Sequence, residues 1–303
     1  MDTRRLKPWM MPIAMVIGAL FHRHIVLFQP LVPYFIFTML LIAFCKAEPR
    51  EFRITRLSWS LLSIQLGGAV LVYLALRGVG VDLAQAAFIC VLCPTATAAP
   101  VVTGMLGGNV ARLATYSIVS NIAAAVSAPA FFAVIGTHSE MSFLDGVLTI
   151  AIKVAPLILL PLLLAFSFYF FAPKLHKAIA RYQSLSFYLW SVSLVVAVGG
   201  AVSYVMSADA SKVPEIIAIA LVAALMCVLQ FAIGRRIGRA CGDRIAGAQG
   251  LGQKNTILAI WMALTYLNPI SSVGPAAYIV WQNTINSVQL YIAARKQSGP
   301  SER

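Results

Sequence analysis

Apolar runs recur along the whole chain, and most are roughly 18 to 24 residues long, enough for a helix to cross the ~30 Å hydrocarbon core of a bilayer. No water is available in that core, so every backbone N–H and C=O group must be satisfied within its own segment, and helices are the expected structure. Hydrophobic residues make up 60% of the chain and charged residues 11%, which excludes a soluble globular protein. The sequence therefore predicts an all-α polytopic membrane protein.

Ten transmembrane spans fit the apolar runs, in a single transmembrane domain that covers residues 1–303. The spans are expected over residues 8–22, 29–45, 57–76, 83–105, 113–136, 146–171, 184–206, 213–234, 245–267 and 273–293. The first run follows the basic leader MDTRRLK and lacks a small-residue cleavage site, so we interpret it as a span and not as a signal peptide.

The Lys and Arg residues test this number of spans, because short cytoplasmic loops carry an excess of them. With the N-terminus inside, eighteen of the 23 fall in cytoplasmic segments. Three fall in outer segments, Arg23, Arg77 and Lys212, and two lie within spans, Lys153 and Lys254. Both termini are therefore predicted to be cytoplasmic. The net charge of +13 is explained by loops that face anionic lipid, and no basic soluble module points to a nucleic-acid partner.

Two of the spans are interrupted by their composition. In the fourth, CPTATAAP places Pro94 and Pro100 around Thr95 and Thr97, and each proline removes a backbone donor and clashes with the preceding turn. In the ninth, GAQGLGQKNT sets three glycines among polar side chains, with Lys254 near its end. Backbone groups exposed at this depth are tolerated only where protein buries them or where they line a water-filled cavity.

The two interruptions occupy matching places, each in the fourth span of a five-span half. Because five is odd, the second half must enter the membrane in the opposite orientation, so we expect two inverted repeats, residues 1–136 and 146–295. Paired interrupted helices of this kind mark the binding site of a secondary transporter. The alternative is that proline and glycine, which are common in membrane helices, merely kink these two spans.

Several motifs resemble the bile acid:sodium symporter family. The stretch CPTATAAPVVTGMLGGNVARLATYSIVSNIAAAVSAPAFF, the segment GLGQKNTILA and the element VWQNTINSVQLYIAARK are similar to the CPGGTASN and GMQNSGLA crossovers, the GNVA turn and the W-x-N element of bacterial homologues. EPREF and Gln65 extend the match over essentially the whole chain. The resemblance implies a bacterial cytoplasmic membrane, a panel domain, and a core domain in which helices 4 and 9 cross. It also implies uptake of organic anions coupled to sodium.

The resemblance also locates positions where the sodium ligands of the family are replaced. These positions are Ala99, Pro100, Leu113 and Gly250, of which the last stands for an acidic residue shared by both sodium sites. Lys254 stands where the family has a glutamine, and Ser117 takes one of the hydroxyl positions of the fifth helix. Gln65, Thr97 and Asn255 are retained.

Sodium coupling is not expected, because sodium prefers several oxygen ligands and a compensating carboxylate. Every acidic residue lies in a predicted loop or at a span end. An ammonium about 4 Å from a sodium ion would also repel it by ~4 kcal/mol at an effective dielectric constant near 20.

A buried, uncompensated lysine costs about 2.5 to 3.5 kcal/mol at a helix centre, so such residues usually serve a site. We hypothesise that Lys254 is a tethered cation that stands in for sodium, bonded to carbonyls freed at the interruptions or to oxygens of Gln65, Thr97 and Ser117. Two other roles stay open: a proton carrier during transport, and a passive lysine that reaches an interface or pairs statically with carbonyls. The predicted substrate and crossover site comprises Gln65, Thr95, Thr97, Ser117, Gln253, Lys254, Asn255 and Asn283.

The favoured function is a secondary transporter of a small organic anion, with protons as a second transported species if Lys254 titrates. The alternative is a membrane receptor or scaffold that keeps the fold without transport. An enzyme is not expected, since no paired carboxylate, metal cluster or activated nucleophile lies within the spans, and no cofactor or metal is implied. Cys90 and Cys93 share a helix face, and packing is their favoured role. The sequence does not determine the anion, the direction of transport or the oligomeric state.

Overall fold

The computed structural model describes residues 13–46, 53–96, 99–136, 143–207 and 209–297. These residues form helices and no strand, and their one β-type contact is an isolated antiparallel bridge between Thr95 and Lys254. A helix over residues 13–20 comes first. The elements that follow are α2 (His22–Ile25), η1 (Val26–Leu31), α3 (Val32–Lys46), α4 (Arg56–Leu76), α5 (Val81–Leu92), α6 (Ala99–Met105), α7 (Val110–Ile135), α8 (Phe143–Phe171), α9 (Pro173–Arg181), α10 (Gln183–Ser207), η3 (Ala210–Lys212), α11 (Val213–Ala240), α12 (Arg244–Gly252), α13 (Thr256–Tyr266), η4 (Pro269–Ser272) and α14 (Val273–Gln297).

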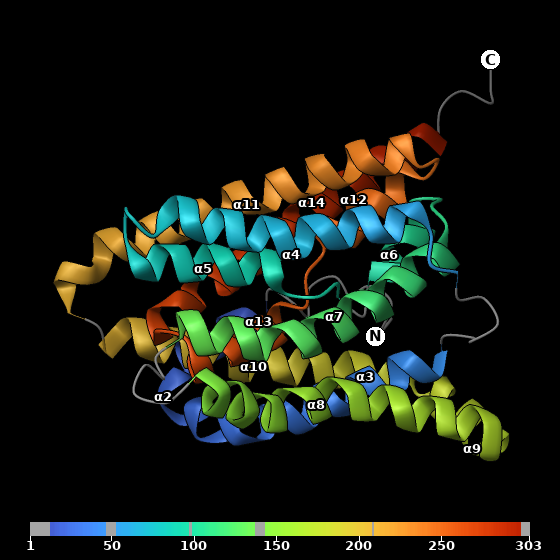
Figure 1. The fold of residues 1–303 in the computed structure, drawn as a ribbon, viewed down its shortest axis with the longest axis horizontal. Coiled ribbons are helices and arrows are strands. Elements are labelled where there is room, and N and C mark those ends of the chain that lie inside the picture. Colours follow the sequence, from blue (N-terminus) through green and yellow to red (C-terminus); the bar gives the residue numbers. More distant parts are fainter. Residues whose placement is uncertain (1–12, 47–52, 97–98, 137–142, 208, 298–303) are drawn as a thin grey trace.

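The long helices run along the longest axis of the molecule and form two groups (Figure 1). In this view α4, α5, α11, α12 and α14 lie along one side, and α2, α3, α8, α9 and α10 lie along the other. Between them lie α7, which packs extensively on α8, and α13, which contacts both α10 and α3. We call the group of α2, α3, α8, α9 and α10 the lower group.

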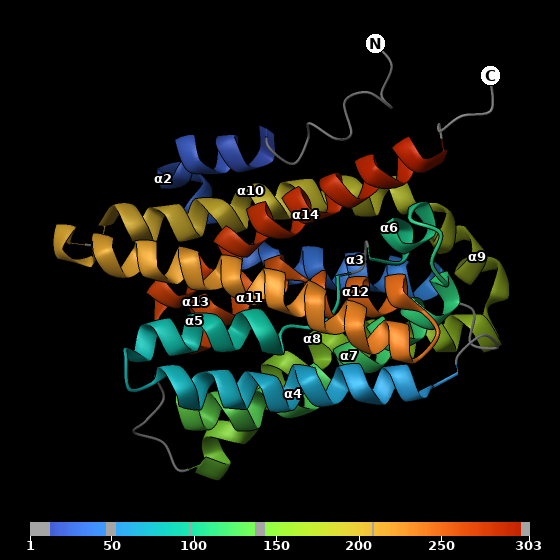
Figure 2. The same cartoon turned by 90° about the horizontal axis from the view of Figure 1, so that it is seen from above.

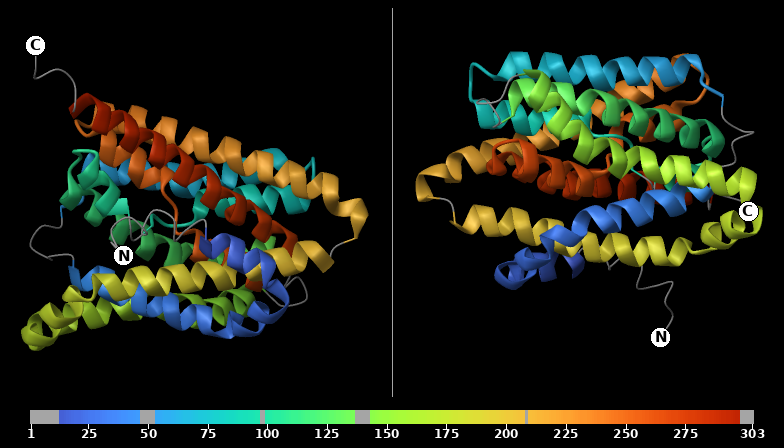
Figure 3. Two further views of the ribbon diagram at one scale, coloured as in Figure 1. Left: turned by 180° about the vertical axis from the view of Figure 1, so that it is seen from behind. Right: turned by 60° about the horizontal axis from the view of Figure 1, so that its bottom comes forward.

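Different segments form the two ends of the bundle (Figures 1 and 3). One end carries the start of α4 with Arg56, the start of α7 with Arg112, the whole of α9 and the turn from α11 to α12. The opposite end carries the turn from α4 to α5, the start of α11 and η4. The described basic segments named above, which were predicted to be cytoplasmic, thus lie at one end of the fold, while its orientation in a membrane stays a prediction.

Five of the described helical segments are long and apolar enough to cross a membrane, which indicates membrane insertion. They are His22–Lys46, Arg56–Leu76, Val110–Ile135, Val147–Phe171 and Ala210–Ala240. The predicted fourth and ninth spans are absent from this set because each is divided into two short helices, α5 with α6 and α12 with α13. The predicted first span begins before the described residues. The predicted seventh and tenth spans correspond to the helices α10 and α14, which are also outside this set.

Glycine allows α11 and α12 to pack very closely. A Cβ atom on Gly247 of α12 would lie 2.3 Å from the backbone oxygen of Gly234, and a Cβ on Gly238 would lie 2.9 Å from the Cα of Gly247. Gly234 and Gly238 form the small-xxx-small pattern through which membrane helices bring their backbones together. The turn between the two helices uses Gly242 in the left-handed region, at φ 78°.

Replacing Gly247 by Leu is expected to destabilise the protein, because the backbone of α11 cannot yield without separating the two helices. Overpacking of this kind costs roughly 1 to 3 kcal/mol, so the thermal midpoint of the purified protein should fall clearly in a detergent unfolding assay. Gly67→Ala on α4 is the control, since a Cβ there meets nothing within 4 Å. Equal midpoints for both variants would contradict the close packing.

Candidate functional site

Both predicted interruptions are confirmed. The first lies between the end of α5 at Leu92 and the start of α6 at Ala99. Cys93 leaves the helical region, at φ −51° and ψ 137°, because the proline that follows disfavours a helical conformation there. The second lies between Gly252 and Thr256, where the Asn255 side chain caps α13 by accepting a hydrogen bond from the Leu258 N–H at 3.3 Å.

The two interruptions cross and pair through their backbones. Around the Thr95–Lys254 bridge, the Ala96 N–H donates to the Gln253 carbonyl and the Asn255 N–H donates to the Pro94 carbonyl, both at 2.9 Å. These are peptide groups that a broken helix leaves without an intrahelical partner. The crossing therefore satisfies, inside the protein, groups that would be costly to leave unpaired in hydrocarbon.

Side chains satisfy the last carbonyls of α5. The Lys254 ammonium donates to the Val91 carbonyl at 2.8 Å, and the Gln65 amide donates to the Leu92 carbonyl at 2.7 Å. Gln230 of α11 donates to the Cys90 carbonyl at 3.2 Å. Lys254 thus places a positive charge at the carboxyl end of a helix, where the helix dipole is negative.

Lys254 is enclosed by the protein, with 1% of its surface exposed. No carboxylate among the described residues forms an ion pair with it. The side chain does not reach a membrane interface, so the snorkelling version of a passive lysine does not fit the structure. Static pairing with a carbonyl does fit, as does the tethered cation, because both predict a bond to a carbonyl freed at an interruption.

Gln65 joins α4 to α7 and to the crossing. Its Oε1 accepts hydrogen bonds from the Tyr116 hydroxyl at 2.9 Å and the Ser120 hydroxyl at 2.8 Å. The Ser120 oxygen in turn accepts from the Thr95 N–H at 3.1 Å, and the Thr95 hydroxyl donates to the Gly250 carbonyl at 2.7 Å. One continuous buried network therefore links α4 and α7 to the first interruption and to α12, just before the second interruption.

The other side of the crossing is held by α14 and α11. The Lys254 N–H donates to Gln282 Oε1 at 2.9 Å, and the Tyr278 hydroxyl donates to the Gly252 carbonyl at 2.8 Å. Gln230 also donates to the Tyr278 hydroxyl, at 3.0 Å. Gln282 accepts a hydrogen bond from the Lys254 N–H, just as Ser120 accepts one from the Thr95 N–H. Each interruption therefore receives a side-chain acceptor from the long helix that follows it, which is α7 for the first and α14 for the second.

The structure brings five of the predicted site residues together at the crossing: Gln65, Thr95, Gln253, Lys254 and Asn255. Thr97 lies outside the described residues. Two predictions need correction. The hydroxyl that α7 gives to the crossing belongs to Ser120, one turn beyond Ser117. The amide that α14 gives belongs to Gln282, whereas Asn283 donates to the Ile279 carbonyl of its own helix at 2.6 Å, because neighbouring residues on a helix point about 100° apart.

Sequence reasoning missed four contributors to this network: Tyr116, Ser120, Gln230 and Tyr278. Each carries a hydroxyl or amide group inside an apolar span. That pattern was a usable signal, because a polar group at such depth needs a partner.

Apolar side chains close the region around the predicted sodium-site positions. A Cβ atom on Gly250 would lie 2.9 Å from Tyr116 Cδ1, 3.0 Å from Leu61 Cδ1 and 3.2 Å from Leu113 Cδ1. Ala99 and Leu113 belong to the same buried hydrophobic cluster, and Pro100 is half-buried at the start of α6. Sodium needs oxygen ligands, so the side chains at these positions do not fit it.

The described residues contain no group of three or more His, Cys, Asp or Glu side chains that could hold a metal ion. Cys90 and Cys93 are free and buried in the main hydrophobic core. Cys93 does more than pack, because its thiol donates a hydrogen bond to the Asn255 carbonyl at 2.9 Å.

Two similar polar contacts tie the outer parts of the broken helices to neighbouring loops. At one end of the bundle Asp243 caps α12, accepting from the Ala246 N–H at 2.8 Å, and also accepts from the Asn109 N–H at 3.2 Å. At the other end Asp82, in the first turn of α5, accepts a hydrogen bond from the Asn268 side chain. Asn109 and Asn268 are 159 positions apart (268 − 109), as are Thr95 and Lys254 (254 − 95).

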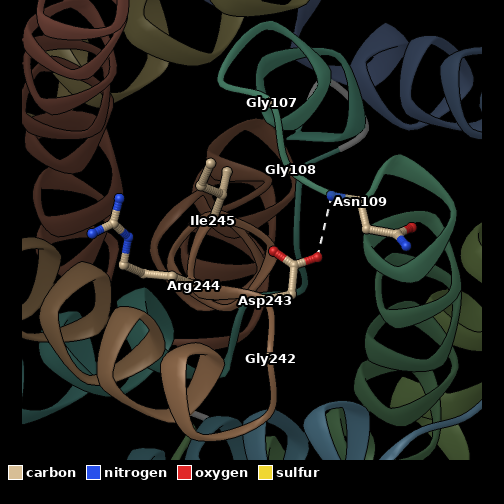
Figure 4. Close-up of a pocket in the computed structure, with 7 residues that line it drawn as sticks. All are labelled: Gly107, Gly108, Asn109, Gly242, Asp243, Arg244 and Ile245. Carbon is tan, nitrogen blue, oxygen red and sulfur yellow. Dashed lines mark hydrogen bonds between the residues drawn. The ribbon is translucent and has the colours of Figure 1, made fainter. Parts of the chain in front are cut away.

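A cavity of about 350 Å³ surrounds the first of these contacts (Figure 4). Asp243 points toward Asn109 across it, while the Arg244 side chain points away. Its lining is Gly107, Gly108, Asn109, Gly242, Asp243, Arg244 and Ile245.

Deeper in the protein an amide bridge joins α12 to α14, since Gln249 donates to Asn286 Oδ1 and Gln289 Oε1, each at 3.1 Å.

No family model matches the chain, and no curated protein matches its sequence. The resemblance to the bile acid:sodium symporters therefore enters below only as a proposal. What the chain does must be argued from the residues at the crossing.

Gln65→Leu is expected to destabilise the protein, because it leaves the Leu92 carbonyl and two hydroxyls buried without this partner. Each unsatisfied buried group costs about 1 to 3 kcal/mol, so the thermal midpoint in detergent should fall by several degrees. Ser63→Ala is the matched control on α4, since its exposed hydroxyl bonds only to the Trp59 carbonyl of the same helix. A midpoint for Gln65→Leu that equals the control would show that the network contributes little.

Proposed function

We propose that this protein is a secondary transporter that carries a small organic anion across a cell membrane by alternating access, without bound sodium. The observation that carries the proposal is the crossing of two interrupted helices at a buried lysine that has no carboxylate partner among the described residues. Interrupted helices that meet in this way expose helix ends to one point inside the membrane, where a transported solute can be held.

The proposed architecture has ten spans in two inverted five-helix repeats. Three observations support it: the equal 159-residue separations, the similar Asp contacts at opposite ends of the bundle, and the acceptor that each interruption receives from the helix that follows it. The two groups of helices in Figure 1 provide candidates for a panel, which is the lower group, and a core that contains the crossing. Movement of one group against the other is the proposed transport step.

Lys254 is proposed to act as a fixed cation in the place where related symporters hold an ion. Its ammonium donates to the Val91 carbonyl and so offsets the partial negative charge at the carboxyl end of α5, which is smaller than the charge of the ammonium. The apolar cluster at Gly250, Leu61 and Leu113 fills the space in which a carboxylate ligand would stand. The charge remains available to attract an anion through the surrounding low-dielectric medium, together with the amino end of α13 at Asn255.

One reconstitution experiment distinguishes transport from the alternative function, which is a receptor or scaffold without transport. The purified protein is reconstituted in liposomes, labelled mono- and dicarboxylates are supplied outside, and sodium, proton or no gradients are imposed. We expect uptake that does not require sodium. Stimulation by an inward proton gradient would identify Lys254 as a proton carrier, and gradient-independent exchange would identify a fixed cation.

Lys254→Ala and Lys254→Gln are expected to lower the initial uptake rate at least tenfold, because a charge-assisted bond worth about 1.5 to 3 kcal/mol is lost. Thr265→Val is the control on α13, where the exposed hydroxyl bonds only to the Trp261 carbonyl of its own helix. Uptake that depends on sodium, or that is unchanged in both Lys254 variants, would contradict the proposed role of the lysine. A complete absence of flux across the panel of acids would favour the receptor or scaffold.

A further inference from the structure

The short helix α9 (Pro173–Arg181) presents a basic face at the edge of the molecule. Lys174, Lys177 and Arg181 are exposed and follow one another at intervals of three and four residues, which places them along one side of the helix. The other side faces the protein: His176 is buried, and Ile179 packs against the hydrophobic core. α9 is therefore a strongly amphipathic helix whose polar side carries only positive charge.

The orientation of α9 is fixed by its neighbours. The chain bends at Ala172, at φ −139° and ψ 62°, and Pro173 begins the new helix. The ring of His176 packs edge-on against Tyr169 of α8, with 5.3 Å between ring centroids, and α9 also packs against α3. In Figure 2, α9 turns across the end of the bundle and does not continue the direction of α8. The basic face is thus held at the end of the bundle where the other basic segments gather.

Large apolar side chains border this basic face. Phe170 and Phe171 are 68% and 87% exposed at the end of α8, and Leu175 and Tyr182 are also exposed. Basic residues beside exposed aromatic and aliphatic groups are typical of helices that lie in the interface of a membrane. The long stems of lysine and arginine allow the charges to reach headgroups while the apolar groups enter the acyl region.

The charges of α9 are not neutralised within the described protein. α9 contains no acidic residue, and no described carboxylate pairs with Lys174, Lys177 or Arg181. The only acidic residue of α8 is Asp145, in its first turn, and α3 has none. The described residues thus supply no counter-charge to this basic face, and an anionic ligand outside the protein can supply it.

We propose that α9 is a docking surface for anionic lipid headgroups of the cytoplasmic leaflet. The phosphates of those lipids supply the negative charge, and the bordering phenylalanines enter the acyl layer. Because α9 packs on α3 and α8, bound lipid anchors the lower group of helices to the membrane. This rests on the proposed function, in which the lower group is the panel, and on the predicted orientation that places this end of the bundle in the cytoplasm.

The test uses the full-length protein in neutral detergent, titrated with phosphatidylglycerol or phosphatidylcholine, with bound lipid measured by native mass spectrometry. The triple variant Lys174→Gln, Lys177→Gln, Arg181→Gln should lose phosphatidylglycerol affinity by on the order of 100-fold, about 3 kcal/mol for three basic residues. The matched control replaces Arg235, Arg236 and Arg239 by Gln, which removes the same charge from an exposed cluster at the end of α11. Its affinity should fall by less than that of the α9 variant.

Three results would overturn the proposal: equal losses in the two triple variants, equal affinity of the wild-type protein for both lipids, or full competition by soluble glycerol 3-phosphate. An unchanged thermal midpoint without lipid shows that the variant is folded. If the triple variant is not folded, two other measurements test the proposal. Lys177→Gln alone should weaken phosphatidylglycerol binding, and 0.5 M salt should suppress binding to the wild-type protein, because salt shortens the distance over which exposed charges interact. The measurement needs no transport, so loss of lipid binding and loss of uptake are separate outcomes.

Discussion

The structure depends on the pairing of two interrupted helices inside the helical bundle. A helix that stops in hydrocarbon leaves several peptide groups without partners, and each would cost several kcal/mol there. Here each interruption supplies partners to the other, through the Thr95–Lys254 bridge and its two flanking backbone bonds. Amide and hydroxyl side chains around the crossing form hydrogen bonds with other peptide groups near the two interruptions. A single interrupted span would have no such solution, so the two halves of the chain must fold together.

Lys254 resolves an electrostatic problem created by that arrangement. The carboxyl end of α5 points its last carbonyls into the protein, where the negative end of the helix dipole is poorly screened. The ammonium bonded to the Val91 carbonyl offsets this charge without a diffusible ion. Removal of the charge would leave the carbonyl unpaired, while addition of a carboxylate at Gly250 is blocked by Tyr116 and two leucines. The lysine and the apolar cluster are thus both consistent with the proposed role of Lys254 as a fixed cation.

The two groups of helices have different relations to their surroundings. The group that contains the crossing is tied internally by buried bonds, such as the amide bridge from Gln249 to Asn286 and Gln289. The lower group carries α9, whose unneutralised basic face and exposed phenylalanines suit a lipid surface. An internally bonded group beside a group with the proposed lipid anchor would support the proposed rigid-body movement of one group against the other.

The sequence alone determined the helical class, the approximate helix positions, both interruptions and the unusual lysine, because these follow from local length, hydrophobicity and backbone chemistry. Gln65 and Thr95 were also predicted for the site. Only the tertiary structure decided that Val91 accepts from Lys254, that Ser120 and not Ser117 reaches the crossing, and that Gln282 and not Asn283 contacts the Lys254 backbone. The reason is geometric: a helix of nearly uniform hydrophobicity can rotate about its axis at little cost, so the face it turns inward is fixed by its neighbours and not by its own residues.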